Sequence, residues 1–313
     1  MSGPFTSGPG TGAIFGNFDI LARIGRGGMA EVFRAQFRAG PRKGRVVALK
    51  RLLPEFNGNA EYVDLFCGEA DLSRMLKHPN IVEVIETGSV GDNYYMAQEF
   101  IDGRDLGQLL ARCRERQIQL PVDFAIFLAQ KLLEALDYAH KAVGPSGREL
   151  NVVHCDVSPS NLFISRTGEI KLGDFGIAKV RSLDADKRNG IWGKVHYASP
   201  ELLKGEDVAP GADIWAAAVT MYELLTLCRP FVGESVDAIA AEILRADPPP
   251  VTYLRPEVPE AVETVLKLAL HPDPTQRFGE AGAFAAALGP LYNDLIGTPL
   301  AIAAVVRGLF GAA

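Results

Sequence analysis

The chain has 313 residues, of which 48% are hydrophobic and 22% charged, with a formal net charge of −6. This composition excludes wholesale disorder and collagen-like sequence, and the acidic balance does not favour nucleic acid as a partner. The four cysteines lie far apart, without a C-x-x-C pair, so the sequence suggests neither a zinc site nor a disulfide framework. No apolar run reaches the roughly 18 residues of a membrane span, and the N-terminus does not resemble a signal peptide. We therefore expect a soluble, cytoplasmic protein.

The first part of the chain is predicted to be rich in β-structure around one helix. Residues 1–17 are rich in Gly, Ser, Pro and Thr and predict a mobile lead. Apolar and β-branched runs predict strands at 19–24, 30–35, 46–49, 81–85 and 94–99.

The helix of this part, predicted over 61–77, carries a carboxylate on its apolar face. Glu69 shares that face with Leu65, Leu72 and Leu76. An unpaired buried carboxylate is costly or becomes neutralised, so we expect a cation to meet Glu69.

The second part of the chain is predicted to be mostly helical after a short connector, Asp102–Arg104. Residues 213–225 are apolar nearly all round, which predicts a helix buried on every side. A tail over 296–313 is expected to dock on the body as a helix, or otherwise to bind a partner. The remaining elements are helices at 121–141, 235–246, 258–270 and 280–295, and loops with short strands over 151–172. The whole is predicted to be a two-lobe α+β protein, and a cleft between such lobes is a natural ligand site.

A glycine-rich segment, Gly25–Val32, is the first motif that carries chemistry. Glycines let backbone N–H groups approach phosphate oxygens closely. A dinucleotide-binding motif would need a helix directly after the glycines, whereas residues 32–35 are strand-like. A Walker A loop is excluded because no Gly-Lys-Ser/Thr ends the segment. The remaining interpretation is a phosphate held under a β-hairpin.

Two further motifs supply a cation and hard oxygen ligands. Lys50 ends the apolar strand 46–49 and is the cation that Glu69 requires. The segment His154–Asn161 is followed by Asp174-Phe175-Gly176, and together they offer Asp156, Asn161 and Asp174. Carboxylate and amide oxygens suit Mg²⁺ that bridges phosphates.

Together these segments resemble the protein kinase family, in the style of its bacterial Ser/Thr members, over roughly Phe18 to Leu295. The resemblance implies a β-rich N-lobe with one helix over 18–101 and a helical C-lobe over 102–295. Further matches are His78–Val82, Ser199-Pro200-Glu201, Asp213 at the start of the buried helix, and Arg277, which is expected to pair with Glu201.

The resemblance also implies roles for single residues, with ATP and Mg²⁺ as cofactors and proteins as substrates. Lys50, paired with Glu69, would hold the α- and β-phosphates. Asp156 would orient the acceptor hydroxyl and take its proton, and Asn161 and Asp174 would hold Mg²⁺. The other nucleotide-binding residues implied are Gly25, Gly27, Gly28 and Ala30 in the glycine-rich segment, Ile24, Val32, Ala48 and Phe163 around the base, Gln98 at the inner pocket, Glu99 to Ile101 at the hinge, and Asp105 at the ribose.

Three residues depart from the family pattern near the catalytic aspartate. Cys155 replaces the arginine of H-R-D, and Ser158 replaces a lysine that in the family steadies the γ-phosphate. Lys194 stands where Ser/Thr kinases carry a threonine that contacts that lysine. We hypothesise that Lys194 supplies the cation and Ser158 the hydroxyl, so that catalysis survives.

Two alternatives stay open beside the active protein kinase. A pseudokinase that binds nucleotide and acts as a scaffold or allosteric partner is favoured by Ser158 and Cys155. A small-molecule kinase on a related fold would phosphorylate a metabolite.

Residues 177–198 contain one serine, Ser182, and no threonine. We therefore expect that phosphorylation of the activation loop does not switch this protein.

His140 is interpreted as a surface or capping histidine.

Overall fold

The computed structural model describes residues 12–175, 195–292 and 297–311. The chain forms two compact units: residues 1–77 with 82–101, here called the N-terminal unit, and residues 78–81 with 102–313, called the C-terminal unit. Within the described ranges, none of the helices has the length and apolar character needed to cross a membrane.

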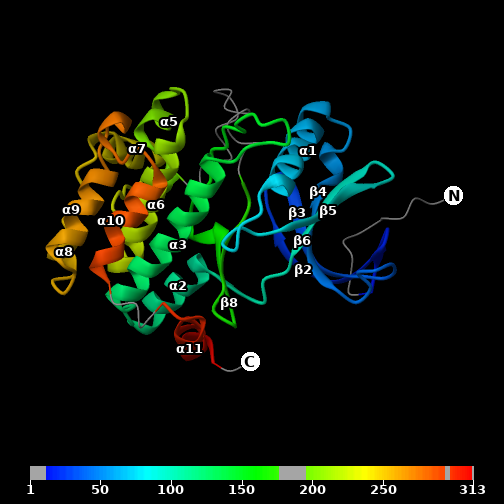
Figure 1. Ribbon diagram of the computed structural model, residues 1–313, viewed down its shortest axis with the longest axis horizontal. Helices are drawn as coiled ribbons and strands as arrows, with labels where there is room; N and C mark the ends of the chain where they lie inside the picture. Colours follow the sequence, from blue (N-terminus) through cyan, green and yellow to red (C-terminus); the bar gives the residue numbers. More distant parts are fainter. Residues whose placement is uncertain (1–11, 176–194, 293–296, 312–313) are drawn as a thin grey trace. The chain divides into compact units, whose positions relative to one another are not determined.

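The N-terminal unit is built on an antiparallel sheet (Figure 1). Among the described residues it has six strands, and β2 and β3 flank the glycine-rich segment as predicted. In spatial order the strands are β1 (Ile14–Phe15), β2 (Phe18–Arg26), β3 (Ala30–Phe37), β4 (Val46–Leu52), β6 (Asn93–Glu99) and β5 (Val84–Val90).

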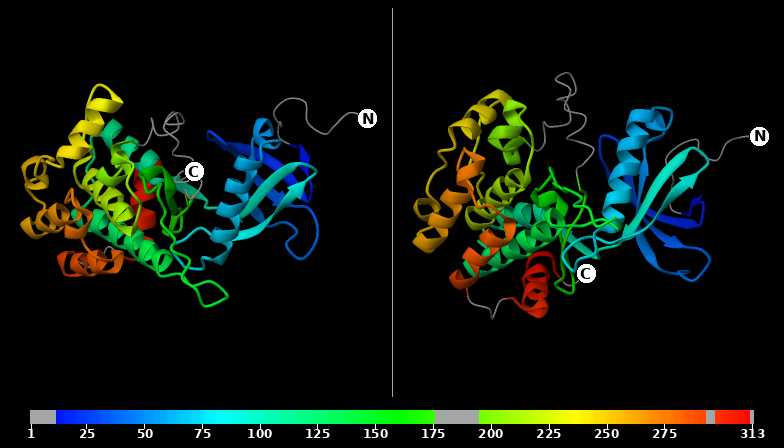
Figure 2. Two further views of the ribbon diagram at one scale, coloured as in Figure 1. Left: turned by 90° about the horizontal axis from the view of Figure 1, so that it is seen from above. Right: turned by 45° about the horizontal axis from the view of Figure 1, so that its top comes forward.

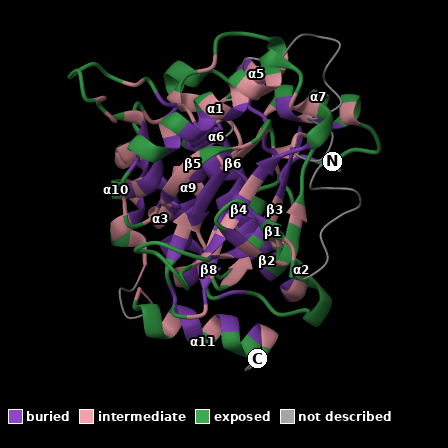
Figure 3. Cartoon of the chain, turned by 90° about the vertical axis from the view of Figure 1, so that its right-hand side faces the viewer, coloured by how far each residue is buried: buried purple, intermediate pink, exposed green. Residues whose placement is uncertain are grey.

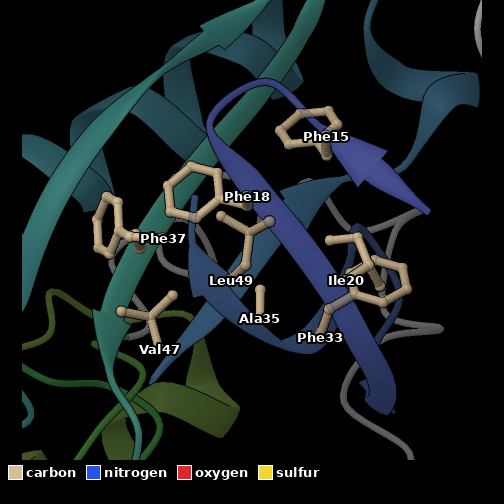
Figure 4. Close-up of a cluster of buried hydrophobic side chains, with 9 residues drawn as sticks. Phe15, Phe18, Ile20, Phe33, Ala35, Phe37, Val47 and Leu49 are labelled. Carbon is tan, nitrogen blue, oxygen red and sulfur yellow. The ribbon is translucent and has the colours of Figure 1, made fainter. Parts of the chain in front are cut away.

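Side chains alternate across this sheet, which gives it one closed and one half-open face. Phe18, Phe33 and Leu49 are fully buried in an apolar cluster on the closed face (Figure 4). Successive residues of a strand point to opposite faces. The neighbours Val32 and Ala48 are accordingly only half-buried. Val32 and Ala48, which are both predicted to contact the nucleotide, therefore lie on the half-open face.

Helix α1 (Ala60–Met75) packs against β5 and β6 within the same unit. Its N-cap Asn59 accepts a hydrogen bond from the backbone N–H of Glu61 at 3.0 Å. The buried apolar residues of the helix are Phe66 and Ala70, whereas Leu65 and Leu72 are half-buried. The predicted apolar face is therefore shifted by about one residue, although Glu69 is buried as expected.

Two predictions for the N-terminal unit are wrong in their boundaries. The lead of 1–17 is too long, because Phe15 is buried and its ring meets Tyr95 edge-on at 5.7 Å; residues 1–11 lie outside the described residues. The strand predicted over 81–85 begins only at Val84. Ile81 instead forms an isolated parallel bridge with Leu172 inside the C-terminal unit.

The C-terminal unit is organised around α6 (Pro210–Thr226). Every residue of α6 from Ala212 to Thr226 is buried, which confirms the predicted fully enclosed helix (Figure 3). Helices α3 and α10 pack against it and against each other (Figure 2). The other α-helices described are α2 (Leu106–Arg116), α3 (Val122–His140), α5 (Pro200–Lys204), α7 (Val236–Arg245), α8 (Val251–Leu254), α9 (Glu260–Ala269), α10 (Ala281–Leu288) and α11 (Pro299–Phe310). Short 3₁₀ turns of this unit lie at Pro159–Asn161, Val195–Tyr197, Pro274–Gln276 and Gly289–Leu291, and the N-terminal unit has one at Pro54–Phe56.

A small antiparallel sheet corrects the predicted connector. Gly103–Asp105 forms β7, which pairs with β8 (Leu162–Ser165), and β8 pairs with β9 (Ile170–Leu172). Two residues of the predicted connector, Gly103 and Arg104, therefore belong to a strand of the C-terminal unit. A Cβ on Gly103 would lie 1.9 Å from the carbonyl oxygen of Ile164, so the pairing requires glycine there.

The C-terminal helices also differ from the prediction at one point. The helix expected over 280–295 ends at Leu288, and a 3₁₀ turn with Pro290 follows. Helix α11 is docked as expected, with Ile302, Val306 and Leu309 buried.

Candidate active site

Lys50 on β4 and Glu69 on α1 form the predicted ion pair of the N-terminal unit. Lys50 Nζ lies 2.5 Å from Glu69 Oε1, and the two side chains are only 12% and 5% exposed. The sequence-based prediction of this pair is confirmed. Shielding from water makes the attraction stronger than at a surface, so each side chain holds the other in place.

A second ion pair, Arg51 with Glu31, was not predicted and supports the glycine-rich hairpin. Arg51 Nε lies 3.2 Å from Glu31 Oε1, and both side chains are buried. The guanidinium also lies over the rings of Phe15 and Phe33, at 5.2 Å from each centroid. Glu31 belongs to the glycine-rich segment, so this pair anchors the strand that follows the glycines. The sequence did offer one signal for this pair. The alternation of β3 places the charged Glu31 on the face of the strand that is otherwise buried and apolar.

The glycine-rich segment is a hairpin turn, followed by a strand. The backbone N–H of Gly27 donates to the carbonyl of Ala30 at 2.8 Å, and Gly25 pairs with Val32. Among the described residues, nothing lies within 4 Å of a Cβ built on Gly28, and only one atom lies that close to a Cβ on Gly27, at 3.6 Å. Packing within the described chain therefore does not explain these two glycines, which fits close approach of a ligand to the backbone.

The other candidate nucleotide residues of this unit lie along β2, β4 and β6. Ala48 is the cross-strand partner of Gln98, whose buried side-chain amide contacts the sulfur of Met96 at 3.6 Å. Ile24 is 50% exposed. The backbone N–H of Glu99 donates to the carbonyl of Glu83 at 2.9 Å. That hydrogen bond aligns the last residue of β6, and Ile101 is half-buried beyond it.

In the C-terminal unit, Asp156 and Asn161 are in direct contact. The side-chain amide of Asn161 donates to the Asp156 carbonyl at 2.8 Å and to Asp156 Oδ2 at 2.9 Å. The 3₁₀ turn Pro159–Asn161 makes this contact possible, because it brings Asn161 back towards Asp156. The amide nitrogen thus orients Asp156. The amide oxygen is the atom of Asn161 that suits a metal.

Asp213 of α6 holds the backbone of the loop that contains Asp156. Its buried carboxylate accepts hydrogen bonds from the N–H of His154 at 2.7 Å and of Cys155 at 2.9 Å. Cys155 has φ of +60°, a conformation that L-residues rarely adopt. The two hydrogen bonds therefore stabilise a strained turn beside Asp156.

The interpretation of His140 as a surface or capping histidine is wrong. Its side chain is 7% exposed and its Nε2 lies 2.8 Å from Asp213 Oδ2. A buried carboxylate needs several donors, and Asp213 obtains a third from His140. The sequence offered only the buried Asp213 as a hint that such a donor would be needed.

His154 connects the Asp156 loop to the segment that contains Asp174. Its Nδ1 accepts the backbone N–H of Asp156 at 3.2 Å, and its Nε2 lies 3.1 Å from the carbonyl of Gly173. The ring packs on Phe175 at 4.5 Å between centroids. Burial lowers the pKa of His154, which favours the neutral ring, and the acceptor role of Nδ1 leaves Nε2 as the donor. Asp174 follows with φ of +54°.

Asp105 and Phe163 are cross-strand partners in the small sheet. Asp105 is also the N-cap of α2, accepting the backbone N–H of Gln108 at 2.8 Å. Burial raises the pKa of Asp105 although backbone hydrogen bonds oppose the shift. The carboxylate predicted to meet the ribose thus already has a structural role.

Arg277 and Glu201 form the predicted buried pair of the C-terminal unit. Arg277 donates two parallel hydrogen bonds of 2.8 Å to the two carboxylate oxygens, and its guanidinium lies 5.1 Å from the ring centroid of Trp215. This prediction is confirmed.

Comparison with known proteins identifies the family that shares these features. The family model described as "Protein kinase domain" matches residues 18–288. The chain belongs to the protein kinase family. This result confirms the resemblance inferred from the motifs, and with it the predicted α+β kinase fold.

Three similar proteins illustrate how far this kinase chain extends along its relatives. It is 35% identical over 300 residues to the tyrosine-protein kinase MasK of Myxococcus xanthus, covering 95% of this chain and 46% of MasK. It is 35% identical over 271 residues to the probable serine/threonine-protein kinase PknB of Lactococcus lactis, covering 85% of this chain and 41% of PknB. The crystal structure of the PknI kinase domain of Mycobacterium tuberculosis aligns with a TM-score of 0.69 and 29% identity, over 91% of this chain and all of that domain. The kinase chain therefore spans less than half the length of these two curated relatives.

Of the two altered positions that were predicted to exchange roles, the structure describes Ser158 but not Lys194. Ser158 is buried, and its hydroxyl lies 3.1 Å from that of Ser160. Lys194 lies outside the described residues, as do Ser182 and Gly176. The exchange of hydroxyl and ammonium between Ser158 and Lys194 therefore stays a prediction, as does the expectation for Ser182.

Cys155 is expected to be a poorly reactive thiol despite its place next to Asp156. Burial raises its pKa well above the ordinary thiol value, and the carboxylates of Asp213 and Asp156 raise it further. The thiolate is the reactive form, so at pH 8 Cys155 should be labelled by iodoacetamide much more slowly than the exposed Cys228. Peptide mass spectrometry over a labelling time course measures both sites, and equal rates at the two cysteines would contradict the prediction.

Proposed function

We propose that this chain is an active protein kinase that transfers the γ-phosphoryl group of MgATP to serine or threonine hydroxyls of proteins. The observation that carries the proposal is the Asp156 loop, in which Asn161 orients the Asp156 carboxylate while Asp213 fixes the backbone. A scaffold without catalysis has no need of that arrangement. We further propose that the protein acts in the cytoplasm, where MgATP is available.

The residues present fit the charge of a metal-bound triphosphate. Lys50 supplies an ammonium group held by Glu69, and Asn161 and Asp174 supply an amide oxygen and a carboxylate. Such hard oxygen donors suit Mg²⁺, which would neutralise phosphate charge when bound. Phosphoryl transfer depends mostly on positioning and electrostatic stabilisation, and side-chain contacts hold Lys50 and Asn161 in place.

Asp156 is proposed to act on the acceptor. Its carboxylate would accept a hydrogen bond from the substrate hydroxyl, orient it, and take its proton as the bond to phosphorus forms. The contact with Asn161 holds the carboxylate in one rotamer for this task.

The acceptor class is part of the proposal. PknB is named a serine/threonine kinase and MasK a tyrosine kinase, and both resemble this chain. We propose Ser and Thr, on the overall likeness of the glycine-rich segment and the catalytic loop to bacterial Ser/Thr kinases. Phosphoamino-acid analysis of the labelled products decides between the classes, and phosphotyrosine alone would overturn this part.

The proposed activity is tested with radiolabelled MgATP. The full chain is incubated alone and with generic protein substrates, and a small-molecule extract is analysed in parallel. Labelled protein supports the proposal. Label in a soluble metabolite without labelled protein would indicate a small-molecule kinase, and nucleotide binding without any transfer would indicate a pseudokinase.

Ser158 is the observation that favours the pseudokinase, because the family lysine is absent there. If Lys194 replaces that cation, Lys194→Met should lower the transfer rate by at least about 100-fold, as loss of one transition-state donor does. Lys204→Met, which removes an exposed lysine on α5, serves as the matched control. Equal transfer rates in wild type and Lys194→Met would reject the exchange.

A further inference from the structure

The C-terminal unit contains a pocket that none of the proposed catalytic or nucleotide residues lines. It has a volume of about 210 Å³ and is lined by the C-terminal end of α11, by β7 and by the residue that follows β8. Part of its wall comes from α11, which lies beyond the residues matched by the kinase family model. The lining residues are Gly103, Arg104, Arg166, Val306, Arg307, Phe310 and Gly311.

All three charged side chains that line this pocket are arginines. Arg104 is on β7, Arg166 follows β8, and Arg307 is on α11, so residues distant in sequence converge. Arg166 Nε lies 3.3 Å from Asp102 Oδ1, and the Asp102 side chain is 73% exposed. Three guanidinium groups from separate segments thus line one small pocket, an arrangement that attracts an anion.

Arg307 lies in the last turn of α11, and two arginines outside the pocket also bind the negative end of this helix. The carbonyls of Leu309 and Gly308 accept hydrogen bonds from Arg112 and Arg116 of α2, each at 3.2 Å. These two arginines already complement the helix C-terminus. The three arginines of the pocket are additional to them.

The pocket is formed by parts that are held in place. The guanidinium of Arg104 lies 5.3 Å from the ring centroid of Phe310 and donates to the Gly103 carbonyl at 3.1 Å. At its other end, α11 packs closely on the turn after β8, where a Cβ on Gly168 would lie 2.0 Å from the Pro299 carbonyl oxygen. A ligand would therefore meet one arginine, Arg104, whose side chain is already held before binding.

We propose that this arginine pocket binds a phosphate group, as inorganic phosphate or as a phosphate monoester. Guanidinium groups match phosphate oxygens with two parallel hydrogen bonds, and the dianion would offset the local charge. The volume admits a phosphate with a small substituent. The binding does not depend on phosphotransfer by the chain, so it is tested separately from the proposed function.

The test measures thermal unfolding of the full chain as inorganic phosphate is raised at constant ionic strength, which keeps general screening fixed. N-acetyl-O-phosphoserine amide is titrated in parallel. We expect saturable stabilisation, with the apparent Kd raised at least tenfold in Arg307→Ala and less in Arg307→Lys. Equal affinity for both probes identifies a site for the free anion, and tenfold tighter binding of the monoester identifies a phosphorylated side chain.

Two control variants separate this site from other sources of phosphate binding. Arg148→Ala removes the same charge from an exposed loop outside the pocket and should bind phosphate as wild type does. Lys50→Met weakens the proposed nucleotide site and should also bind phosphate normally. The proposal is overturned if stabilisation does not saturate, if Arg148→Ala weakens binding as much as Arg307→Ala, or if Lys50→Met abolishes binding while Arg307→Ala does not.

Discussion

Replacing Asp156 by asparagine is expected to lower the phosphotransfer rate by about 10²- to 10⁴-fold, the range for loss of a positioned general base. The amide has nearly the same shape as the carboxylate, and its oxygen can still accept the hydrogen bond from Asn161. The loop should therefore keep its conformation, and nucleotide affinity should hardly change. Initial rates with radiolabelled ATP, together with the affinity for a fluorescent nucleotide, measure the two quantities.

A control for the Asp156 variant must separate loss of the base from loss of charge. Asp207→Asn changes the same functional group at an exposed position of the C-terminal unit and should keep the full rate. Thermal unfolding of both variants should match wild type. Full activity of Asp156→Asn would show that another group takes the proton, and a parallel loss of nucleotide binding would show that the substitution damaged the loop.

The sequence predicted best those features that depend on one strong local constraint. Helix α6 was recognisable because residues apolar on all sides can only be enclosed. The pair of Lys50 and Glu69 was predictable because a carboxylate on an apolar helix face requires a cation. In both cases the cost of the alternative is several kcal/mol, so tertiary context has little freedom to change the outcome.

The sequence predicted poorly those features that depend on pairing between distant segments. Asp102–Arg104 was interpreted as a connector because so short a segment shows no periodicity, and only pairing with β8 makes Gly103–Asp105 a strand. Phe15 lies in a region with a polar, glycine-rich composition, yet its burial follows from Tyr95 and the rest of the cluster. The face of α1 was misplaced by about one residue, because periodicity alone does not say which of two adjacent apolar rows meets the sheet.

In the candidate site, too, the sequence predicted residues with a local signature and missed those defined by distant partners. Motifs located Asp156, Asn161 and Asp174, because those residue types are dictated by chemistry. The supporting contacts of His140 and Arg51 were missed, because each is defined by a partner distant in sequence, Asp213 and Glu31. Supporting residues of this kind carry no chemical signature of their own, and only the fold identifies them.

Replacing Arg277 by methionine is expected to destabilise the C-terminal unit by about 3–5 kcal/mol, the cost of removing one partner from a buried ion pair. Arg277 and Glu201 have side chains that are 0% and 5% exposed, so the carboxylate would stay buried without its cation. Arg277 also donates to the carbonyls of His271 at 2.7 Å and Gly211 at 2.8 Å, which would lose their donor. Chemical denaturation followed by circular dichroism measures the free energy of unfolding.

The pH dependence of this loss identifies its cause. Burial alone would raise the pKa of Glu201, but the hydrogen bonds from Arg277 outweigh it and the net pKa is lowered. In wild type, the stabilisation from Glu201 is therefore present above its unfolded pKa near 4.5 and is lost as pH falls below it. In Arg277→Met the buried, unpaired carboxyl should have a raised pKa, so protonation relieves the penalty. The difference in stability between the two proteins should narrow from pH 7 to pH 4.

An exposed arginine of the same unit provides the contrast for Arg277. Arg245 pairs with Glu242 on α7 at 2.9 Å, with side chains 65% and 39% exposed. Arg245→Met should cost no more than about 1 kcal/mol, because water screens exposed ion pairs and solvates the partner that remains. If Arg277→Met costs no more than Arg245→Met, or if its loss is constant from pH 7 to pH 4, the buried pair is not the source of the stability. A large loss of stability in Arg277→Met that narrows on acidification, beside a small loss in Arg245→Met, would assign the effect to the desolvated carboxylate of Glu201.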